Sequence, residues 1–313
     1  MIRTVAKTSF EDHRFGIMKA PVLFVHRFTV LDYARVTEHG FEGESVYVDA
    51  ELLGELDSRG FLMDFGPVKK LLKGLVDDVI DHRLAVPTRA PRLRLNIDGD
   101  RAELDCREVG RSGFRYQAPT EALAVLDAER VDDEAVTRFL EQRVSERLPA
   151  NVREVRFSLT PAAELEQEPS FRYTHGLKLH EGNCQRLIHG HRNVIEVKVD
   201  GHPHRAGAEL LADFFHNAHF VEHGDLDVSI PTGQRSAGER RCSIVYRASQ
   251  GRFDAELPIG RLLPMNCEPT VENIAVFAHG WVSQQLDVES TRVSVLAYEG
   301  LHKGAGAGLG FTC

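Results

Sequence analysis

The sequence predicts an α+β protein built from two similar units that follow one another along the chain. Its 313 residues are enough for two domains. Both halves contain segments in which apolar and polar residues alternate, typical of strands with one buried face, and segments with helical periodicity. The order of these segments in the first half recurs in the second. We expect one unit over residues 1–165 and another over 166–313, which meet in the polar stretch 164–169.

Composition excludes several classes of protein. Hydrophobic residues make up 42% of the chain, which allows a sizeable core. Lys and Arg number 38 against 47 Asp and Glu, and this net charge of −9 argues against non-specific nucleic-acid binding. No run approaches 18 apolar residues, and the first residues lack the apolar segment of a signal peptide, so we expect neither a membrane span nor export. The cysteines are odd in number and widely spaced, which favours reduced thiols and a cytoplasmic protein: Cys106, Cys184, Cys242, Cys267 and Cys313.

The internal repeat begins with two alternating segments, residues 42–52 and 189–199, which we predict to be strands. Further along, residues 80–88 match 221–232, so that Glu222-His223 would be the counterpart of Asp81-His82. Each half then has a hairpin pattern, around Asp98-Gly99 in the first half and around Gly251 in the second.

Helical periodicity accounts for the remaining segments. Residues 67–80 place apolar side chains three and four positions apart, and Pro67 suits the first turn. Residues 132–148 and 270–286 show the same spacing, and Asp132 and Thr270 are suitable N-caps. The segment 206–220 is less regular, and we expect it to be the counterpart of 67–80. Each half closes with an alternating strand, 155–159 or 293–297, and the glycine-rich residues 304–308 are expected to be mobile.

Three histidines in the second half have the spacing of a metal site. His189 and His191 are two positions apart, so on a strand both point to the same face at a separation of about 6.6 Å. His175, on a neighbouring strand, can supply a third nitrogen. Three imidazoles with an open fourth position are typical of catalytic zinc. A His-rich surface loop is the alternative, because the chain has 15 histidines.

Other residues can carry proton chemistry. Cys184 precedes His189 by five positions, and it is either a base or nucleophile beside a metal or a buried, inert thiol. Asp81 can orient His82 as in proton relays, although such neighbours are common by chance. Glu299 follows the last predicted strand and is either a substrate carboxylate or an exposed strand end. A further histidine group would share one helical face, as a solvated surface or a second metal site: His216, His219 and His223.

Taken together, these motifs resemble the 6-pyruvoyl-tetrahydropterin synthase and 6-carboxy-tetrahydropterin synthase family. The resemblance covers most of the chain, but neither half contains all the motifs. The second half has Phe171-x-x-x-His175, Cys184 followed by His189-Gly190-His191, Pro269-Thr270-x-Glu272-Asn273 and Tyr298-Glu299-Gly300. The first half has Gly60-Phe61-Leu62-Met63-Asp64-Phe65 and Asp81-His82-Arg83-Leu84.

The resemblance implies a tandem tunnelling fold, in which antiparallel sheets carry helices on one face and form a barrel by oligomerisation, here as a homo-oligomer. It implies Zn²⁺ on His175, His189 and His191, and a catalytic thiol at Cys184. It also implies that Glu299 anchors the pterin and that Thr270 and Glu272 contribute to substrate binding. The implied reaction is loss of triphosphate from 7,8-dihydroneopterin triphosphate, with the product open between pyruvoyl, carboxy and retro-aldol compounds. Candidate phosphate contacts are Lys178, Arg186 and Arg192.

The first half departs from the family pattern. Its metal-ligand positions are aligned with Asp32, Glu42 and Glu44, and Pro161 or a neighbour replaces the terminal glutamate. We interpret this half as having lost zinc, with a hard-cation site of carboxylates as the alternative. The defects of the two halves are complementary. We therefore hypothesise that Asp81 and His82 complete the site around Cys184, within one chain or across an oligomer interface, with His223 as the competing catalytic residue.

Two other functions fit parts of this pattern. One is a pterin-binding or purine-binding protein without turnover, for which the thiol of Cys184 would serve no purpose. The other is a zinc hydrolase that uses metal-bound water, which would not need Glu299 or Asp81-His82.

Overall fold

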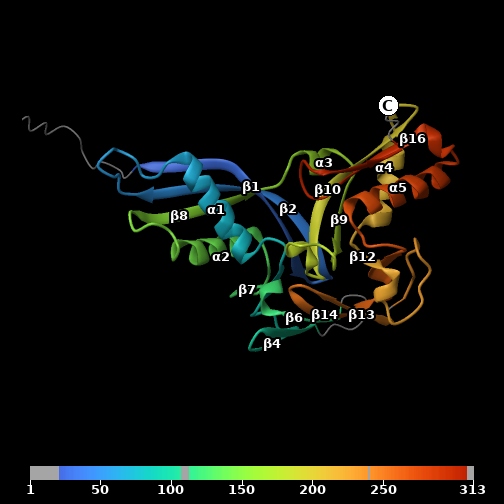
Figure 1. Ribbon diagram of the computed structural model, residues 1–313, viewed down its shortest axis with the longest axis horizontal. Coiled ribbons are helices and arrows are strands. Elements are labelled where there is room, and N and C mark those ends of the chain that lie inside the picture. Colours follow the sequence, from blue (N-terminus) through green and yellow to red (C-terminus); the bar gives the residue numbers. More distant parts are fainter. Residues whose placement is uncertain (1–20, 107–112, 239, 309–313) are drawn as a thin grey trace, which may run out of the picture.

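A computed structural model describes residues 21–106, 113–238 and 240–308 of the chain. It confirms the α+β class: the molecule is elongated, and each end is formed by a large sheet with two helices on one side (Figure 1). A smaller sheet lies below the junction of the two ends (Figure 1). No helix within the described ranges is long and apolar enough to cross a bilayer.

The first unit is built on a long hairpin of β1 (Val22–Thr37) and β2 (Gly40–Gly54). Its sheet has the order β7-β3-β1-β2-β8, in which β8 (Val152–Thr160) is antiparallel to β2. On the other side, β3 (Leu84–Pro87) and β7 (Leu123–Leu126) extend the sheet in parallel. Helices α1 (Phe65–Val79) and α2 (Asp133–Ser145) close the core, and their buried side chains include Val68, Leu72, Val76, Val136 and Leu140.

The second unit repeats this arrangement with shorter strands. Its sheet has the order β15-β12-β9-β10-β16-β17, with β11 (His202–Pro203) paired to the side of β10. Helices α4 (Arg205–Phe215) and α5 (Val271–Leu286) close its core. The strands are β9 (Ser170–His175), β10 (His189–Val199), β12 (Ala218–Glu222), β15 (Leu262–Met265), β16 (Val293–Tyr298) and β17 (Gly304–Ala307).

The predicted hairpins of the two halves join into one sheet. Its order is β13-β14-β6-β5-β4, and the pairing of β14 with β6 connects the insertion of the second unit to that of the first. One face packs on a shared core through residues such as Phe114, Tyr116 and Ile244. The strands are β4 (Leu93–Asp98), β5 (Arg101–Cys106), β6 (Phe114–Pro119), β13 (Arg241–Ala248) and β14 (Gly251–Pro258).

Both predicted N-caps are present. The Asp132 carboxylate accepts a hydrogen bond of 2.9 Å from Ala135 N, and the Thr270 hydroxyl accepts one of 3.3 Å from Asn273 N. The helix predicted over 206–220 is too long, because α4 ends at Phe215 and β12 begins at Ala218. The predicted histidine face is therefore wrong: one residue follows the helix, one lies on a strand and one begins a 3₁₀ turn, namely His216, His219 and His223.

Two other segments differ from expectation. The polar stretch between the halves contains a short helix, α3 (Glu164–Gln167), in which Leu165 is buried. The C-terminal glycine-rich segment was expected to be mobile, but it forms β17 and pairs with β16. Within the described residues there are five 3₁₀ turns: η1 (Thr120–Ala122), η2 (Asn183–Gln185), η3 (His223–Asp225), η4 (Ile259–Arg261) and η5 (Ser290–Arg292).

The two long hairpins touch where each carries a glycine. A β-carbon added to Gly190 would lie 2.8 Å from the Gly43 α-carbon, and one added to Gly43 would overlap the backbone of His191 and Tyr173. Only glycine fits such a close approach of two backbones. The contact brings β1 and β2 of the first unit against the strand that carries His189 and His191.

Candidate active site

The three predicted metal ligands converge at the second unit's hairpin. His189 on β10 lies directly opposite His175 on β9, and their ring centroids are 4.4 Å apart. His191 lies two positions further along β10, 5.3 Å from the His175 ring and 5.5 Å from the His189 ring. All three side chains are fully buried, and one nitrogen of each lies within 4.8 Å of the others. The strand spacing thus gathers the imidazoles around one point.

Each of these rings has an acceptor at one nitrogen. Nδ1 of His175 lies 2.8 Å from the Pro269 carbonyl oxygen, and Nδ1 of His189 lies 2.8 Å from the Arg186 carbonyl oxygen. Nδ1 of His191 lies 3.3 Å from a carboxylate oxygen of Asp32. The three Nε2 atoms are buried without a hydrogen-bond partner. His175 and His189 thus have the arrangement of metal-ligating histidines, whose outer nitrogen donates while the inner one binds the ion. At the outer nitrogen of His191, the Asp32 carboxylate lies at ion-pair distance.

The protonation of the rings suits the same role. Burial, helped by the neighbouring His191, lowers the pKa of His175 to about 3. Burial and the neighbouring imidazoles also hold the pKa of His189 well below its usual value. Both rings are therefore neutral near pH 7, as metal ligation requires. Three buried Nε2 atoms without a hydrogen-bond partner, gathered around one point, fit Zn²⁺ well.

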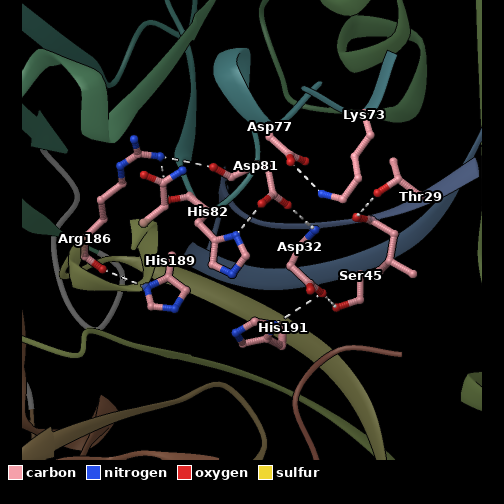
Figure 2. Close-up of polar contacts among 12 residues, drawn as sticks. Thr29, Asp32, Ser45, Lys73, Asp77, Asp81, His82, Arg186, His189 and His191 are labelled. Carbon is pink, nitrogen blue, oxygen red and sulfur yellow. Dashed lines mark hydrogen bonds and ion pairs between the residues drawn. The ribbon is translucent and has the colours of Figure 1, made fainter. Parts of the chain in front are cut away.

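The first unit contributes an aspartate–histidine pair to this cluster. His82 lies in the turn between α1 and β3, and its Nδ1 is 2.5 Å from a carboxylate oxygen of Asp81 (Figure 2). The other Asp81 oxygen accepts a hydrogen bond of 3.1 Å from Asp32 N. The His82 ring lies 5.2 Å from the His189 ring, and its backbone φ is +54°. A histidine in the left-handed region indicates that the surroundings force this conformation.

Cys184 completes the group. It lies in η2, within the loop from β9 to β10, and its thiol, a His82 nitrogen and a His189 nitrogen are all within 4.8 Å of one another. Burial would lower the pKa of His82, but hydrogen bonds to Asp81 and Cys184 outweigh it and raise that pKa well above its usual value. The structure thus brings together, within one chain, the thiol of the second unit and the aspartate–histidine pair of the first.

Glu299 follows β16 directly and faces the three candidate metal-ligand histidines. One carboxylate oxygen lies 3.7 Å from Nε2 of His191 and 3.9 Å from Nε2 of His175. Burial raises the pKa of Glu299, but the nearby imidazoles and Lys303 outweigh it, and the net shift is downward. Lys303 also lies 3.5 Å from a carboxylate oxygen of Asp32. Glu299 and Asp32 therefore place two carboxylates beside the three candidate metal ligands.

The remaining predicted residues lie further out. The Thr270 hydroxyl caps α5, directly after the Pro269 carbonyl that holds His175. Glu272 is exposed in the first turn of α5. His223 begins η3 and belongs to neither group of potential ligands in the described part of the chain.

The predicted equivalence of Glu222-His223 with Asp81-His82 is wrong. The amide of His82 donates to the Asp32 carbonyl at 2.7 Å, and in the second unit the amide of Asn217 donates to the Arg172 carbonyl at 2.8 Å. Both residues have left-handed backbones, with φ of +54° and +53°, and both precede the short parallel strand of their unit. The counterpart of Asp81-His82 is therefore His216-Asn217.

Strand register also corrects the metal-ligand positions of the first unit. Arg35 lies opposite Glu42 as His175 lies opposite His189, so the counterpart of His175 is Arg35 and not Asp32. By the same register, the counterpart of Asp32 is Arg172.

Arginines surround the carboxylates that replace the ligands. Arg35 Nη2 lies 2.7 Å from Glu42 and 3.1 Å from Glu44, and Arg172 Nη2 lies 2.9 Å from Glu44. Arg192 Nη1 approaches Glu44 at 4.0 Å. We call these five residues the ion-pair cluster. The Arg35 guanidinium occupies the position that His175 has in the second unit, and the other two arginines also pair with the carboxylates. This argues against a hard-cation site in the first unit.

The candidate phosphate contacts are engaged within the protein. Lys178 Nζ lies 2.6 Å from Asp225 and 2.7 Å from Glu222. Arg186 Nη1 donates to the Asp81 carbonyl at 3.1 Å, so it supports the turn that carries His82 (Figure 2). Arg192 belongs to the ion-pair cluster.

Fold and side chains together define a tandem α+β protein with a candidate active site to which both units contribute: the second supplies the metal ligands and Cys184, and the first supplies Asp81 and His82. Residues 164–305 match the family model of 6-pyruvoyl tetrahydropterin synthase, which confirms the resemblance for the second unit. Two solved structures of this enzyme share 16% and 14% identity with the chain, from Plasmodium vivax and Plasmodium falciparum. They cover 46% and 45% of this chain and 94% and 91% of their own, with TM-scores of 0.37 and 0.36. No curated protein gave a significant match.

Sequence reasoning missed two contacts at the site. It assigned Asp32 to the first unit's own metal position, whereas its carboxylate faces His191 of the second unit. It did not single out Lys303, which lies in the turn before β17. Neither residue belongs to a motif, and only the contact between the two hairpins could reveal them.

Proposed function

We propose that the protein is a zinc-dependent lyase that acts on 7,8-dihydroneopterin triphosphate, or a related reduced pterin, with loss of triphosphate. The observation that carries this proposal is the meeting, in one chain, of three orphaned imidazole nitrogens, a thiol and an aspartate–histidine pair. A pure binding site or a simple hydrolase would not need the last two. The family match of residues 164–305 supports the same chemistry.

In this proposal His175, His189 and His191 hold Zn²⁺. When bound, Zn²⁺ would orient the side-chain hydroxyls of the substrate and stabilise developing enolate charge. Glu299 would accept the parallel N–H groups of the pterin ring, a task that an ionised carboxylate suits. Thr270 and Glu272 would line the same end of the substrate.

Cys184 and His82 would move protons during the reaction. In its thiolate form, Cys184 would take a proton from the substrate side chain onto its sulfur, and His82, hydrogen-bonded to that sulfur, would stabilise the thiolate before the transfer. Asp81 would keep the His82 ring oriented, because its carboxylate accepts a hydrogen bond from the Nδ1–H group. Elimination of triphosphate then follows from the carbanion that loss of the proton creates.

We also propose that each chain forms one active site from two units, residues 1–165 and 166–313. Each of the two large sheets ends in a strand, β8 or β17, with one side unpaired in the described residues. Pairing of these edges between copies would give the homo-oligomeric barrel that the resemblance implies.

The test combines zinc analysis with turnover. Purified wild type, His189→Ala, His82→Ala and His223→Ala proteins are assayed for zinc and incubated with 7,8-dihydroneopterin triphosphate, and products are identified by mass spectrometry. We expect His189→Ala to lose zinc, His82→Ala to keep zinc but lose at least a hundredfold in turnover, and His223→Ala to resemble the wild type. The proposal is wrong if wild type binds zinc but releases no triphosphate, or if only His223→Ala abolishes turnover.

A further inference from the structure

The hairpin β13–β14 inserted into the second unit reaches the turn that carries Cys184. Its tip, Ser249-Gln250, lies beside η2, in which Cys184 stands between Asn183 and Gln185. The Gln250 side-chain amide donates to the Asn183 side-chain oxygen at 2.9 Å. The hairpin therefore contacts the residue immediately before the thiol.

The residue immediately after the thiol is held more firmly. Ser249 Oγ and the backbone N–H of Gln250 both donate to the side-chain oxygen of Gln185, each at 3.0 Å. Tyr246 Oη, further down β13, donates to the Gln185 carbonyl at 2.6 Å. Gln185 is fully buried, as is its bond from Tyr246, while the two bonds from the hairpin tip are partly buried. Together the three bonds hold Gln185 in one position.

The surroundings leave the turn little freedom. A β-carbon on Gly176 would overlap the Tyr246 hydroxyl and lie 2.6 Å from the Leu187 α-carbon, so the loop packs closely against the hairpin. The carbonyl of Cys184 itself accepts a hydrogen bond of 2.8 Å from Leu177 N. In addition, β14 pairs with β6 of the first unit, so the hairpin is anchored to the unit that supplies His82.

We propose that Tyr246, Ser249 and Gln250 are positioning residues for Cys184: they fix η2 so that the thiol faces His82. The insertion thereby aligns a thiol from one unit with a histidine from the other. As a statement about catalysis this rests on the proposed function, but the position of the turn can be measured without turnover.

The test compares Ser249→Ala/Gln250→Ala with the wild type by hydrogen exchange and by alkylation. Without the two side chains, amide exchange in the peptide containing residues 182–188 should accelerate at least tenfold. Iodoacetamide should alkylate Cys184 at least fivefold faster, because the thiol leaves its half-buried position. Where turnover is measurable, kcat should fall about tenfold while KM and zinc content stay unchanged.

Two further variants separate positioning from general weakening of the sheet. Gln117→Ala is the matched control, because Gln117 lies on the same sheet but on the half-exposed face, opposite the buried face that carries Tyr246. It should leave exchange and alkylation at wild-type values. Gln250→Glu is the conservative variant: rotation of the Asn183 amide would let it donate to the new carboxylate, so the variant should restore slow exchange when Ser249 is intact.

Unchanged exchange and alkylation in the double variant would overturn the proposal, and so would equal acceleration in Gln117→Ala. Faster exchange with unchanged kcat in an active enzyme would also overturn it, because the turn would then be held without serving the thiol. A wild type without turnover would remove the proposed function, and the exchange and alkylation results would still decide whether the hairpin positions the turn.

Discussion

Glu44→Gln is the sharpest perturbation of the ion-pair cluster, because it removes a charge and keeps the shape of the side chain. Glu44 is 4% exposed, and its carboxylate lies 2.9 Å from Arg172 and 3.1 Å from Arg35. Removing one partner of a buried ion pair costs about 3–5 kcal/mol, because the other charge stays buried. Both arginine side chains are about one-fifth exposed, so water relieves part of that cost. We expect a loss of about 2–3 kcal/mol.

The assay is urea unfolding followed by circular dichroism, with zinc content measured in parallel. Glu154→Gln is the matched control, since Glu154 pairs with Arg156 at 2.6 Å but both side chains are about half exposed. We expect that control to lose less than about 1 kcal/mol. Zinc content should be unchanged in both variants, because the imidazoles belong to the other unit.

Equal losses in the two variants would refute the reasoning, because they would show that burial adds nothing to the Glu44 ion pairs. Stabilisation of the wild type by Mg²⁺ or Mn²⁺ that disappears in Glu44→Gln would refute it in another way. The carboxylates would then bind a cation that the arginines were argued to replace.

Three further predictions concern packing, capping and thiol chemistry. Gly43→Ala should greatly weaken the contact between the two hairpins and lower zinc affinity, because its β-carbon would overlap the His191 backbone. Gly74→Ala, at an exposed position of α1, should instead stabilise the protein by about 0.5–1 kcal/mol. Melting curves and zinc titration compare the two variants. Asp132→Ala should cost about 1 kcal/mol in urea unfolding, since it leaves Ala135 N without its cap, and an unchanged midpoint would contradict this. Burial, reinforced by Asp227, raises the pKa of Cys242 to about 12, so only about one thiol in ten thousand is ionised at pH 8. Iodoacetamide should therefore label Cys242 only after the protein unfolds. If native Cys242 were labelled as fast as the exposed Cys267, this reasoning would be wrong.

The sequence was most informative where one element determines its own pattern. The row of apolar side chains that α1 buries and the N-caps of α2 and α5 are local features, and the structure confirms them. The spacing of His189 and His191 is also local, because a strand alternates its faces whatever it packs against. These features predicted the gathering of the imidazoles.

The pairing of the two units could not be read in the same way. Glu222-His223 resembles Asp81-His82 in amino-acid sequence. The backbone hydrogen bonds, however, show that His216-Asn217 is the structural counterpart of Asp81-His82 in the second unit. The equivalence depends on parallel pairings of only a few residues, β1 with β3 and β9 with β12, which leave no periodic pattern. The joining of β14 to β6 is equally invisible, because each hairpin alone has the pattern of an independent insertion.

The contact between the hairpins gives a physical reason for the complementary defects of the two units. Asp32 on β1 faces His191 on β10, and its counterpart Arg172 on β9 faces Glu44, the counterpart of His191 on β2. The same contact between the two hairpins therefore occurs twice with different side chains. In one, the Asp32 carboxylate faces the His191 imidazole, and in the other, the Arg172 guanidinium faces the Glu44 carboxylate. A buried carboxylate at position 44 needs a permanent cation. Arg35, at the position of the ligand His175, and Arg172, at the position of Asp32, both supply one. Restoring histidine at position 44 alone would thus place it beside two arginines, so a second zinc site would require replacing the arginines as well.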